Sequence, residues 1–178
     1  QTRSALPARA TVIAANEAQA TMSLRSGDWR AHTSSSTPRI GLMFTGQGSQ
    51  FTAMGAALYR DVEVFRRAID DLDAAVPEAH VVHLLCAQEV DLLPTQAAQP
   101  AMFALGWGLH AVLRSWGVRP VAVLGHSVGE IAAAAAAGIL SAEDGLRLAL
   151  ERGRLMGALP PGGAMAAVFA SEAEVAAA

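Results

Sequence analysis

The feature that most constrains this chain is a serine between two glycines, where an apolar segment gives way to an alanine-rich one. The sequence Gly125-His126-Ser127-Val128-Gly129 follows the apolar residues 120–124 and precedes a helical pattern that runs through Ala137. Small residues at both ends of such a motif let a strand turn sharply into a helix, which lifts the serine hydroxyl out of the sheet. The free N–H groups of that helix favour negative charge that develops beside Ser127. The pattern therefore predicts a nucleophile elbow.

The rest of the chain alternates between strand and helix patterns. Buried strands are predicted at residues 40–44 and 120–124, and a third strand at residues 163–170. Helical patterns occupy residues 53–59, 62–75, about 97–116 and 141–159, and a last helix begins at Glu172. Residues 78–95 fit neither pattern. Alternating strands and helices are typical of α/β proteins with a parallel sheet, so we expect this fold class with a hydrolase-like core.

The first 38 residues differ from the remainder. Ala10–Ala15 predicts a short strand, and Asn16 is placed to cap a helix over Glu17–Arg25. The run Thr33–Pro38 is rich in serine and threonine and ends in proline, which is typical of a linker. We therefore place a domain boundary near Pro38. Because the chain begins with Gln1 rather than methionine, we interpret it as a piece of a longer polypeptide or a processed end.

Composition excludes several classes of protein. The 178 residues are 52% hydrophobic and 16% charged, with a net charge of -3, which favours a folded core over a disordered chain. No arginine cluster is dense enough to indicate nucleic-acid binding, and the longest apolar run, residues 131–140, is too short to span a membrane. We expect no nucleic-acid or membrane partner and a cytoplasmic location.

The remaining titratable residues indicate structural roles. The single cysteine, Cys86, excludes an internal disulfide and a cysteine-based zinc site, and we expect it to be buried and inert. Asp70, Asp71 and Asp73 predict a solvated acidic helix face rather than a metal site, and no metal is expected elsewhere. His110 lies on the long predicted helix, where its expected role is core packing or a place on the surface.

A second glycine-rich turn, Gly46-Gln47-Gly48, also follows a predicted strand. Ligands in open α/β sheets bind at the carboxyl ends of strands, so this turn and the elbow could face one pocket. Acyl transfer needs two N–H donors for the oxyanion, usually one after the nucleophile and one from another loop. The N–H of Val128 supplies the first donor, and that of Gln47 is a candidate for the second.

These motifs together resemble a known family. Phe44–Gln50, Gln99-Pro100-Ala101, Gly125–Glu130 and Arg152 appear in the order and spacing of the acyltransferase domain of modular polyketide synthases. More broadly, the chain is similar to the malonyl-CoA:acyl-carrier-protein transacylases. The resemblance runs from about Ile40 to the end. It implies that residues 1–38 are the linker between a ketosynthase and its acyltransferase, that 39–161 form part of the large subdomain, and that 162–178 begin a small ferredoxin-like subdomain.

The resemblance also assigns a role to each motif. Ser127 is the expected nucleophile, and the N–H groups of Gln47 and Val128 form the oxyanion hole. Arg152 corresponds to the arginine that pairs with the free carboxylate of a malonyl-type acyl group. Gln99 and His126 are placed with the substrate-binding residues, His126 chiefly as structural support.

The implied reaction is a two-step acyl transfer. A malonyl-type extender unit passes from coenzyme A to the serine, and then to the phosphopantetheine thiol of an acyl carrier protein. The neighbouring ketosynthase of the same polypeptide is a further expected partner, and the domain itself binds no cofactor. An aliphatic residue after the nucleophile, here Val128, and the segment Thr95–Gln99 both resemble the malonyl-selective pattern.

One expected component is missing. The family uses a Ser–His pair whose histidine lies well C-terminal of the nucleophile, and none of the chain's five histidines replaces it: His32, His80, His83, His110 and His126. We therefore predict that the isolated chain is weakly active or inactive. Two alternatives remain at this point: a serine hydrolase or thioesterase-like enzyme that shares the elbow, and a non-catalytic remnant or interaction module. The Gln47 and Arg152 motifs argue against a simple hydrolase.

Overall fold

The computed structural model describes residues 6, 8–33, 38–160 and 168–177. The chain divides into two compact units, Gln1–Arg39 and Ile40–Ala178, and the division falls beside Pro38, where the sequence places a boundary. In the described ranges, no helix has the length and apolar character needed to cross a bilayer.

The N-terminal unit is a helix between two paired strands. Strands β1 (Ala8–Thr11) and β2 (Arg30–Thr33) are antiparallel and flank helix α1 (Glu17–Ser26). The side chain of Asn16 accepts a hydrogen bond from the Gln19 N–H at 2.9 Å, as expected for the predicted cap. The predicted strand at 10–15 is displaced, since β1 begins at Ala8 and ends at Thr11 where its pairing with β2 ends. The sequence pattern did not predict β2.

Among its described residues, the larger unit contains a parallel two-stranded sheet, seven helical elements up to Gly157 and one further short helix. Strands β3 (Gly41–Phe44) and β4 (Ala122–Gly125) pair in register from Gly41 opposite Ala122 to Phe44 opposite Gly125. The helices are α2 (Ala56–Asp61), α3 (Glu63–Ala75), the 3-10 turn η1 (Pro77–Ala79), α4 (Val81–Cys86), α5 (Thr95–Ser115), α6 (Val128–Ala136), α7 (Ala142–Gly157) and α8 (Glu172–Ala176). The parallel sheet and the helices confirm the predicted α/β class.

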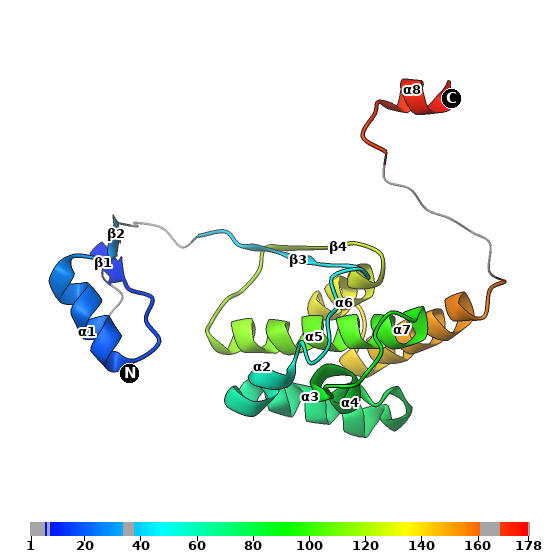
Figure 1. Cartoon of the computed structure of the whole chain (residues 1–178), viewed down its shortest axis with the longest axis horizontal. Helices are drawn as coiled ribbons and strands as arrows, with labels where there is room; N and C mark the ends of the chain where they lie inside the picture. The colour runs from blue at the N-terminus through cyan, green and yellow to red at the C-terminus, as the bar shows by residue number, and fades with distance from the viewer. Residues whose placement is uncertain (1–5, 7, 34–37, 161–167, 178) are drawn as a thin grey trace. The chain divides into compact units, whose positions relative to one another are not determined.

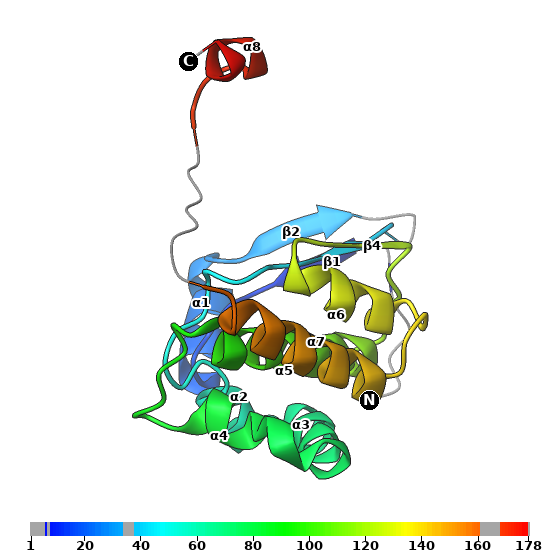
Figure 2. The same ribbon diagram turned by 90° about the vertical axis from the view of Figure 1, so that its right-hand side faces the viewer.

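Helix α5 is the centre of this unit. Figures 1 and 2 show α5 and α7 lying between the sheet with α6 on one side and α2, α3 and α4 on the other. Gly108 lets α3 approach α5 closely, because a Cβ at this position would lie 2.5 Å from the ring of Phe65 on α3. Phe65, Phe103 and Leu146 are fully buried around α5. Burying each such side chain contributes about 1.5–3 kcal/mol, so this helix anchors the layers on both sides.

The ends of the helices follow their sequence signals. The Ser141 hydroxyl accepts the Asp144 N–H at 3.0 Å and begins α7. Gly117, with φ +86°, ends α5, and the Val118 N–H returns to the Leu113 carbonyl at 3.0 Å. Most of the predicted strand at 163–170 lies outside the described residues, and 168–170 carry no strand. The predicted start of a ferredoxin-like subdomain therefore stays a prediction.

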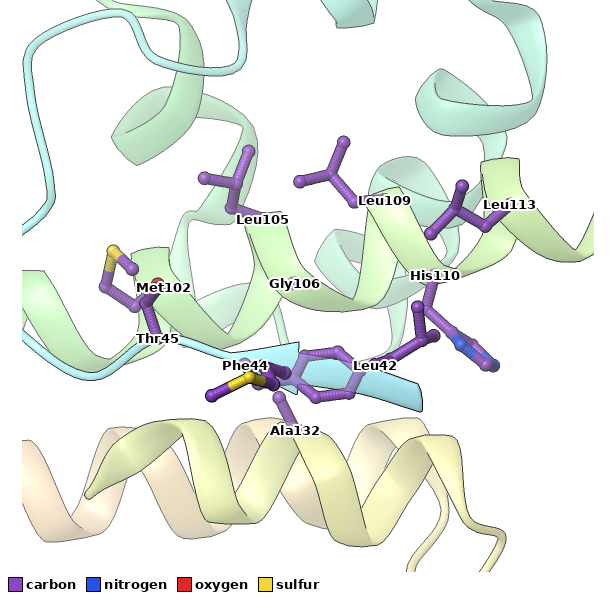
Figure 3. Close-up of a pocket in the computed structure, with 11 residues that line it drawn as sticks. Leu42, Phe44, Thr45, Met102, Leu105, Gly106, Leu109, His110, Leu113 and Ala132 are labelled. Carbon is purple, nitrogen blue, oxygen red and sulfur yellow. The ribbon is translucent and has the colours of Figure 1, made fainter. Parts of the chain in front are cut away.

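The two strands are less buried than their apolar sequences predict. Met43 and Leu124 are 80% and 61% exposed, whereas Leu42 and Phe44 point toward the helices (Figure 3). The prediction of buried strands is therefore wrong for one face of the sheet. Helices cover one face only, and within the described residues of this unit nothing covers the other.

The cavity in Figure 3 lies between β3 and α5. It has a volume of about 240 Å³ and is lined mainly by leucine, methionine and phenylalanine side chains. His110 lies beside it, 93% buried, with its ring centroid 5.6 Å from that of Trp107. Burial lowers the pKa of His110, so the neutral imidazole is favoured and it packs in the core, the first of the two roles expected of it.

Cys86, at the end of α4, is only partly buried, which corrects the expectation of a fully buried thiol. The burial that it does have raises the pKa of the thiol. The thiol form therefore predominates at neutral pH, which agrees with an inert role.

Two of the three aspartates on α3 bind other parts of the unit. Asp70 accepts a hydrogen bond of 2.5 Å from the hydroxyl of Tyr59 on α2, and Asp73 accepts the Val82 N–H at 3.2 Å. Asp70 and Asp71 are exposed, as predicted for a solvated face, whereas Asp73 is partly buried. The hydrogen bond to Asp70, aided by burial, raises the pKa of Tyr59 to about 12.

Tyr59 is the only tyrosine of the chain, so its ionisation can be followed directly by tyrosinate absorbance. We predict a titration midpoint near pH 12 that falls toward its ordinary value in Asp70→Ala. Because the folded-state pKa is raised, the stabilisation is complete below about pH 10 and is lost as the pH rises through the folded value. The Asp71→Ala variant is the matched control and should leave the midpoint unchanged. A wild-type midpoint near 10 would contradict this hydrogen bond.

Candidate active site

The serine motif forms the predicted elbow between β4 and α6. Ser127 has φ +55° and ψ -121°, a conformation that non-glycine residues rarely adopt and that costs of order 1–3 kcal/mol. Its flanking glycines allow the close approach that holds this conformation. A Cβ at Gly125 would lie 2.2 Å from the Glu130 nitrogen, and one at Gly129 would lie 2.3 Å from the Phe44 oxygen. The backbone of the motif therefore packs closely against the end of β3 and against the first turn of α6.

The second glycine-rich turn lies directly against the elbow. The His126 N–H donates to the Phe44 carbonyl at 3.1 Å. A Cβ at Gly46 would lie 2.7 Å from Nδ1 of His126 and 3.3 Å from Cβ of Ser127. The imidazole of His126 therefore packs against the backbone of Gly46, which agrees with a supporting role. The two strand ends meet at one site, as the sequence predicts.

The segment that leads into α5 holds the Gly46–Gly48 turn. The Gln50 side chain accepts the Gly48 N–H at 2.7 Å and donates to the Leu92 carbonyl at 3.1 Å. The Thr95 hydroxyl donates to Oε1 of Gln47 at 2.8 Å. Two side-chain hydrogen bonds, from Gln50 and to Gln47, therefore connect the turn region to residues 92–95.

Arg152 reaches the serine from α7. Its Nη2 donates to Oγ of Ser127 at 3.2 Å, and its Nη1 donates to Oε1 of Gln99 at 2.6 Å. Gln99 is fully buried, and its Nε2 donates to Oγ1 of Thr95 at 2.8 Å and lies 3.3 Å from Sδ of Met156. Five predicted residues, Ser127, Gln47, Val128, Arg152 and Gln99, thus come from adjoining elements to one place.

Glycines on α7 allow Arg152 to meet Gln99. A Cβ at Gly153 would lie 2.9 Å from the Thr95 carbonyl, and one at Gly157 would lie 2.2 Å from the carboxamide of Gln96. The start of α5 therefore rests on the backbone of α7. This contact fixes the position of Arg152 relative to Gln99.

Sequence reasoning missed the bridging role of Thr95 and the contact with Met156. Thr95 and Gln99 are four residues apart on α5, and residues at this spacing share one helix face. That spacing could have indicated that Thr95 lies next to Gln99. Met156 is four residues after Arg152 on α7, but a methionine carries no comparable polar signal.

No histidine of the described chain hydrogen-bonds to Ser127, whose observed partner is Arg152. His126 packs on Gly46, and His110 lies in the core. His80, just before α4, and His83, on α4, are both exposed. Among the described residues, no three or more His, Cys, Asp or Glu side chains are grouped to hold a metal ion. What the site offers is a strained serine, helix N–H groups and one guanidinium.

Comparison with known proteins identifies this arrangement. Residues 42–178 match the model of the acyl transferase domain family. The chain belongs to this acyltransferase family. It is 45% identical over 150 residues to the polyketide synthase GfsA of Streptomyces halstedii and 43% identical over 148 residues to the mycoketide-CoA synthase of Mycobacterium tuberculosis. These matches cover 77% and 80% of the chain but only 2% and 4% of those proteins.

Solved structures agree with this membership. The acyltransferase domain from the second module of the salinomycin polyketide synthase is 40% identical to this acyltransferase chain, with a TM-score of 0.85. The match covers 96% of the chain and 43% of that domain. A malonyl-transacylase solved in complex with a type II polyketide synthase acyl-carrier protein is 29% identical, with a TM-score of 0.62, over 69% of the chain and 40% of that structure. The chain thus spans less than half of these solved relatives.

The close contact of Gly129 with the end of β3 leads to a prediction about stability. Gly129→Ala places a methyl group against the Phe44 carbonyl, so we expect a loss of about 3 kcal/mol or more in the free energy of unfolding, measured by urea denaturation. Gly41→Ala is the matched control, since its Cβ would meet only the Ala122 oxygen at 3.8 Å. Equal effects of the two substitutions would contradict the close contact between the elbow and β3.

Proposed function

We propose that this chain carries the nucleophile and the carboxylate-binding residues of a polyketide synthase acyltransferase that loads a malonyl-type extender unit. The observation that carries the proposal is the 3.2 Å contact between Nη2 of Arg152 and Oγ of Ser127. A guanidinium at this distance from a nucleophile is placed to pair with the free carboxylate of an acyl group attached to that oxygen. Family membership supplies the reaction type, and this contact supports the class of substrate.

The proposed reaction proceeds in two transfers. Oγ of Ser127 attacks the thioester carbonyl of malonyl-CoA, the C–S bond breaks, and coenzyme A leaves as the thiol after taking a proton. The phosphopantetheine thiol of an acyl carrier protein then attacks the seryl ester, and the serine regains its proton. The solved malonyl-transacylase bound to an acyl-carrier protein supports this choice of acceptor.

The N–H groups of Gln47 and Val128 are the proposed oxyanion donors. Val128 is the first residue of α6, where a helical N–H has no acceptor within its own helix. The Gln47 backbone lies in the turn that packs against the elbow. Preorganised donors of this kind stabilise the charge that develops on the thioester oxygen and lower the barrier.

Arg152 supplies the proposed selectivity for a diacid. A guanidinium binds a carboxylate through two parallel N–H bonds, whereas the methyl group of an acetyl thioester offers no acceptor. The partial burial of Arg152 strengthens that pair relative to one in open water. The contact with buried Gln99 holds the guanidinium in place. Val128 and the Thr95–Gln99 segment support malonyl as the extender unit.

The wider setting is part of the same proposal. We place residues 1–38 as the linker from a ketosynthase in the same polypeptide, residues 39–161 in the large subdomain, and residues 162–178 at the start of the small one. The reaction uses coenzyme A thioesters and carrier-bound phosphopantetheine as substrates, with no cofactor held by the domain, and takes place in the cytoplasm. Because no described histidine is placed to take the proton from Ser127, we expect the chain alone to react slowly or not at all.

The carboxylate assignment is tested by substitution of Arg152. We expect Arg152→Ala to weaken malonyl-CoA binding at least about tenfold, as for a lost charge-assisted hydrogen bond, while acetyl-CoA binding stays unchanged. Isothermal titration calorimetry with the 178-residue chain measures both affinities without requiring turnover.

Arg154→Ala is the control, because Arg154 lies on the same helix and pairs with Glu151 at the surface. It should leave both affinities as they are. Equal losses for malonyl-CoA and acetyl-CoA in Arg152→Ala would contradict the carboxylate role.

A further inference from the structure

The side chains behind Ser127 form one directed chain of hydrogen bonds. Arg152 donates to Gln99 at 2.6 Å, Gln99 donates to Thr95 at 2.8 Å, and Thr95 donates to Gln47 at 2.8 Å. The chain begins at the guanidinium that faces the serine and ends at the side chain of the turn beside the elbow.

Arginine sets the direction of every bond in this chain. A guanidinium has donors and no acceptor, so Gln99 must present its oxygen to Arg152 and its NH₂ group to Thr95. The Thr95 hydroxyl therefore accepts from Gln99 and has its single proton left for Oε1 of Gln47. Both hydrogen-bonding functions of this hydroxyl are used, and each bond polarises the next in the same sense.

We propose that Thr95 is a positioning residue, which orients Gln99 so that Arg152 is held for the acyl carboxylate and which ties that site to the Gln47 turn. The inference rests on the proposed function and deepens it. Thr95 itself touches neither the reacting atoms nor the carboxylate in this account. It acts through Gln99 on one side and through Gln47 on the other.

Burial makes the Thr95 hydroxyl hard to replace. Gln99 is fully buried, so solvent does not supply a replacement acceptor for its NH₂ group when the hydroxyl is removed. The remaining neighbour of Nε2 is the sulfur of Met156, which is a weak acceptor. Without Thr95, the carboxamide keeps its bond to Arg152 and only this weak contact on the other side, so the guanidinium loses a well-oriented support.

The test compares Thr95→Val, which keeps the shape and removes the hydroxyl, with Thr95→Ser, which keeps the hydroxyl. Calorimetry with the 178-residue chain measures the binding of malonyl-CoA and of acetyl-CoA. We expect Thr95→Val to weaken malonyl-CoA binding about five- to tenfold and to leave acetyl-CoA unchanged, as for loss of one hydrogen bond to a buried group. Thr95→Ser should bind both ligands as the wild type does.

A double-mutant cycle separates positioning from general packing. If Thr95 acts through Arg152, then Thr95→Val causes no further loss of malonyl-CoA binding in the Arg152→Ala background. A loss of the same size in both backgrounds would overturn the inference and leave the proposed function standing. Should Arg152→Ala itself spare malonyl-CoA, the proposed function fails first, and the inference fails with it.

A measurement on the wild-type chain covers the case in which Thr95→Val does not fold. NMR follows the side-chain amide protons of Gln99, which are buried and do not face the ligand. We expect them to exchange slowly with solvent and to shift on addition of malonyl-CoA but not of acetyl-CoA. Fast exchange, or equal shifts with both ligands, would overturn the role of Thr95.

Discussion

The close contact between two glycine-rich turns is the constraint on which the site depends. Gly129 of the elbow lies against the carbonyl groups at the end of β3, and Gly46 of the neighbouring turn lies against His126 and Ser127. Neither approach tolerates a side chain. The contact fixes the strained backbone of Ser127, and it places the Gln47 turn beside the same serine. The alternating strands and helices matter for function because they bring these two turns together.

The placement of Arg152 depends on a second contact, between α5 and α7. Gly153 and Gly157 let the backbone of α7 approach the first turn of α5, so that Arg152 meets Gln99 beneath the serine. From there the hydrogen bonds continue through Thr95 to Gln47. The start of α5 thus contacts both Arg152, the proposed carboxylate-binding residue, and the Gln47 turn, the proposed oxyanion donor. This arrangement accounts for the polar residues Thr95 and Gln99 at the start of a largely apolar helix.

Much of this could be predicted from the sequence, because motifs that depend on backbone contact leave clear residue patterns. The elbow, the Gly46–Gly48 turn and the caps at Asn16 and Ser141 are local features of this kind. The exposure of Met43 and Leu124 could not be predicted in this way, since burial depends on which elements cover a sheet face. The pairing of β1 with β2 and the hydrogen bonds of Asp70 and Asp73 depend likewise on partners distant in the sequence.

The most direct test of the account is the acylation of Ser127 itself. The 178-residue chain is incubated with malonyl-CoA and increasing concentrations of imidazole as an external base, and the product is mapped by peptide mass spectrometry. The account predicts one malonyl ester per chain, on Ser127, that forms faster as imidazole is added. Malonyl groups on another residue, or none on Ser127 at any imidazole concentration, would contradict it.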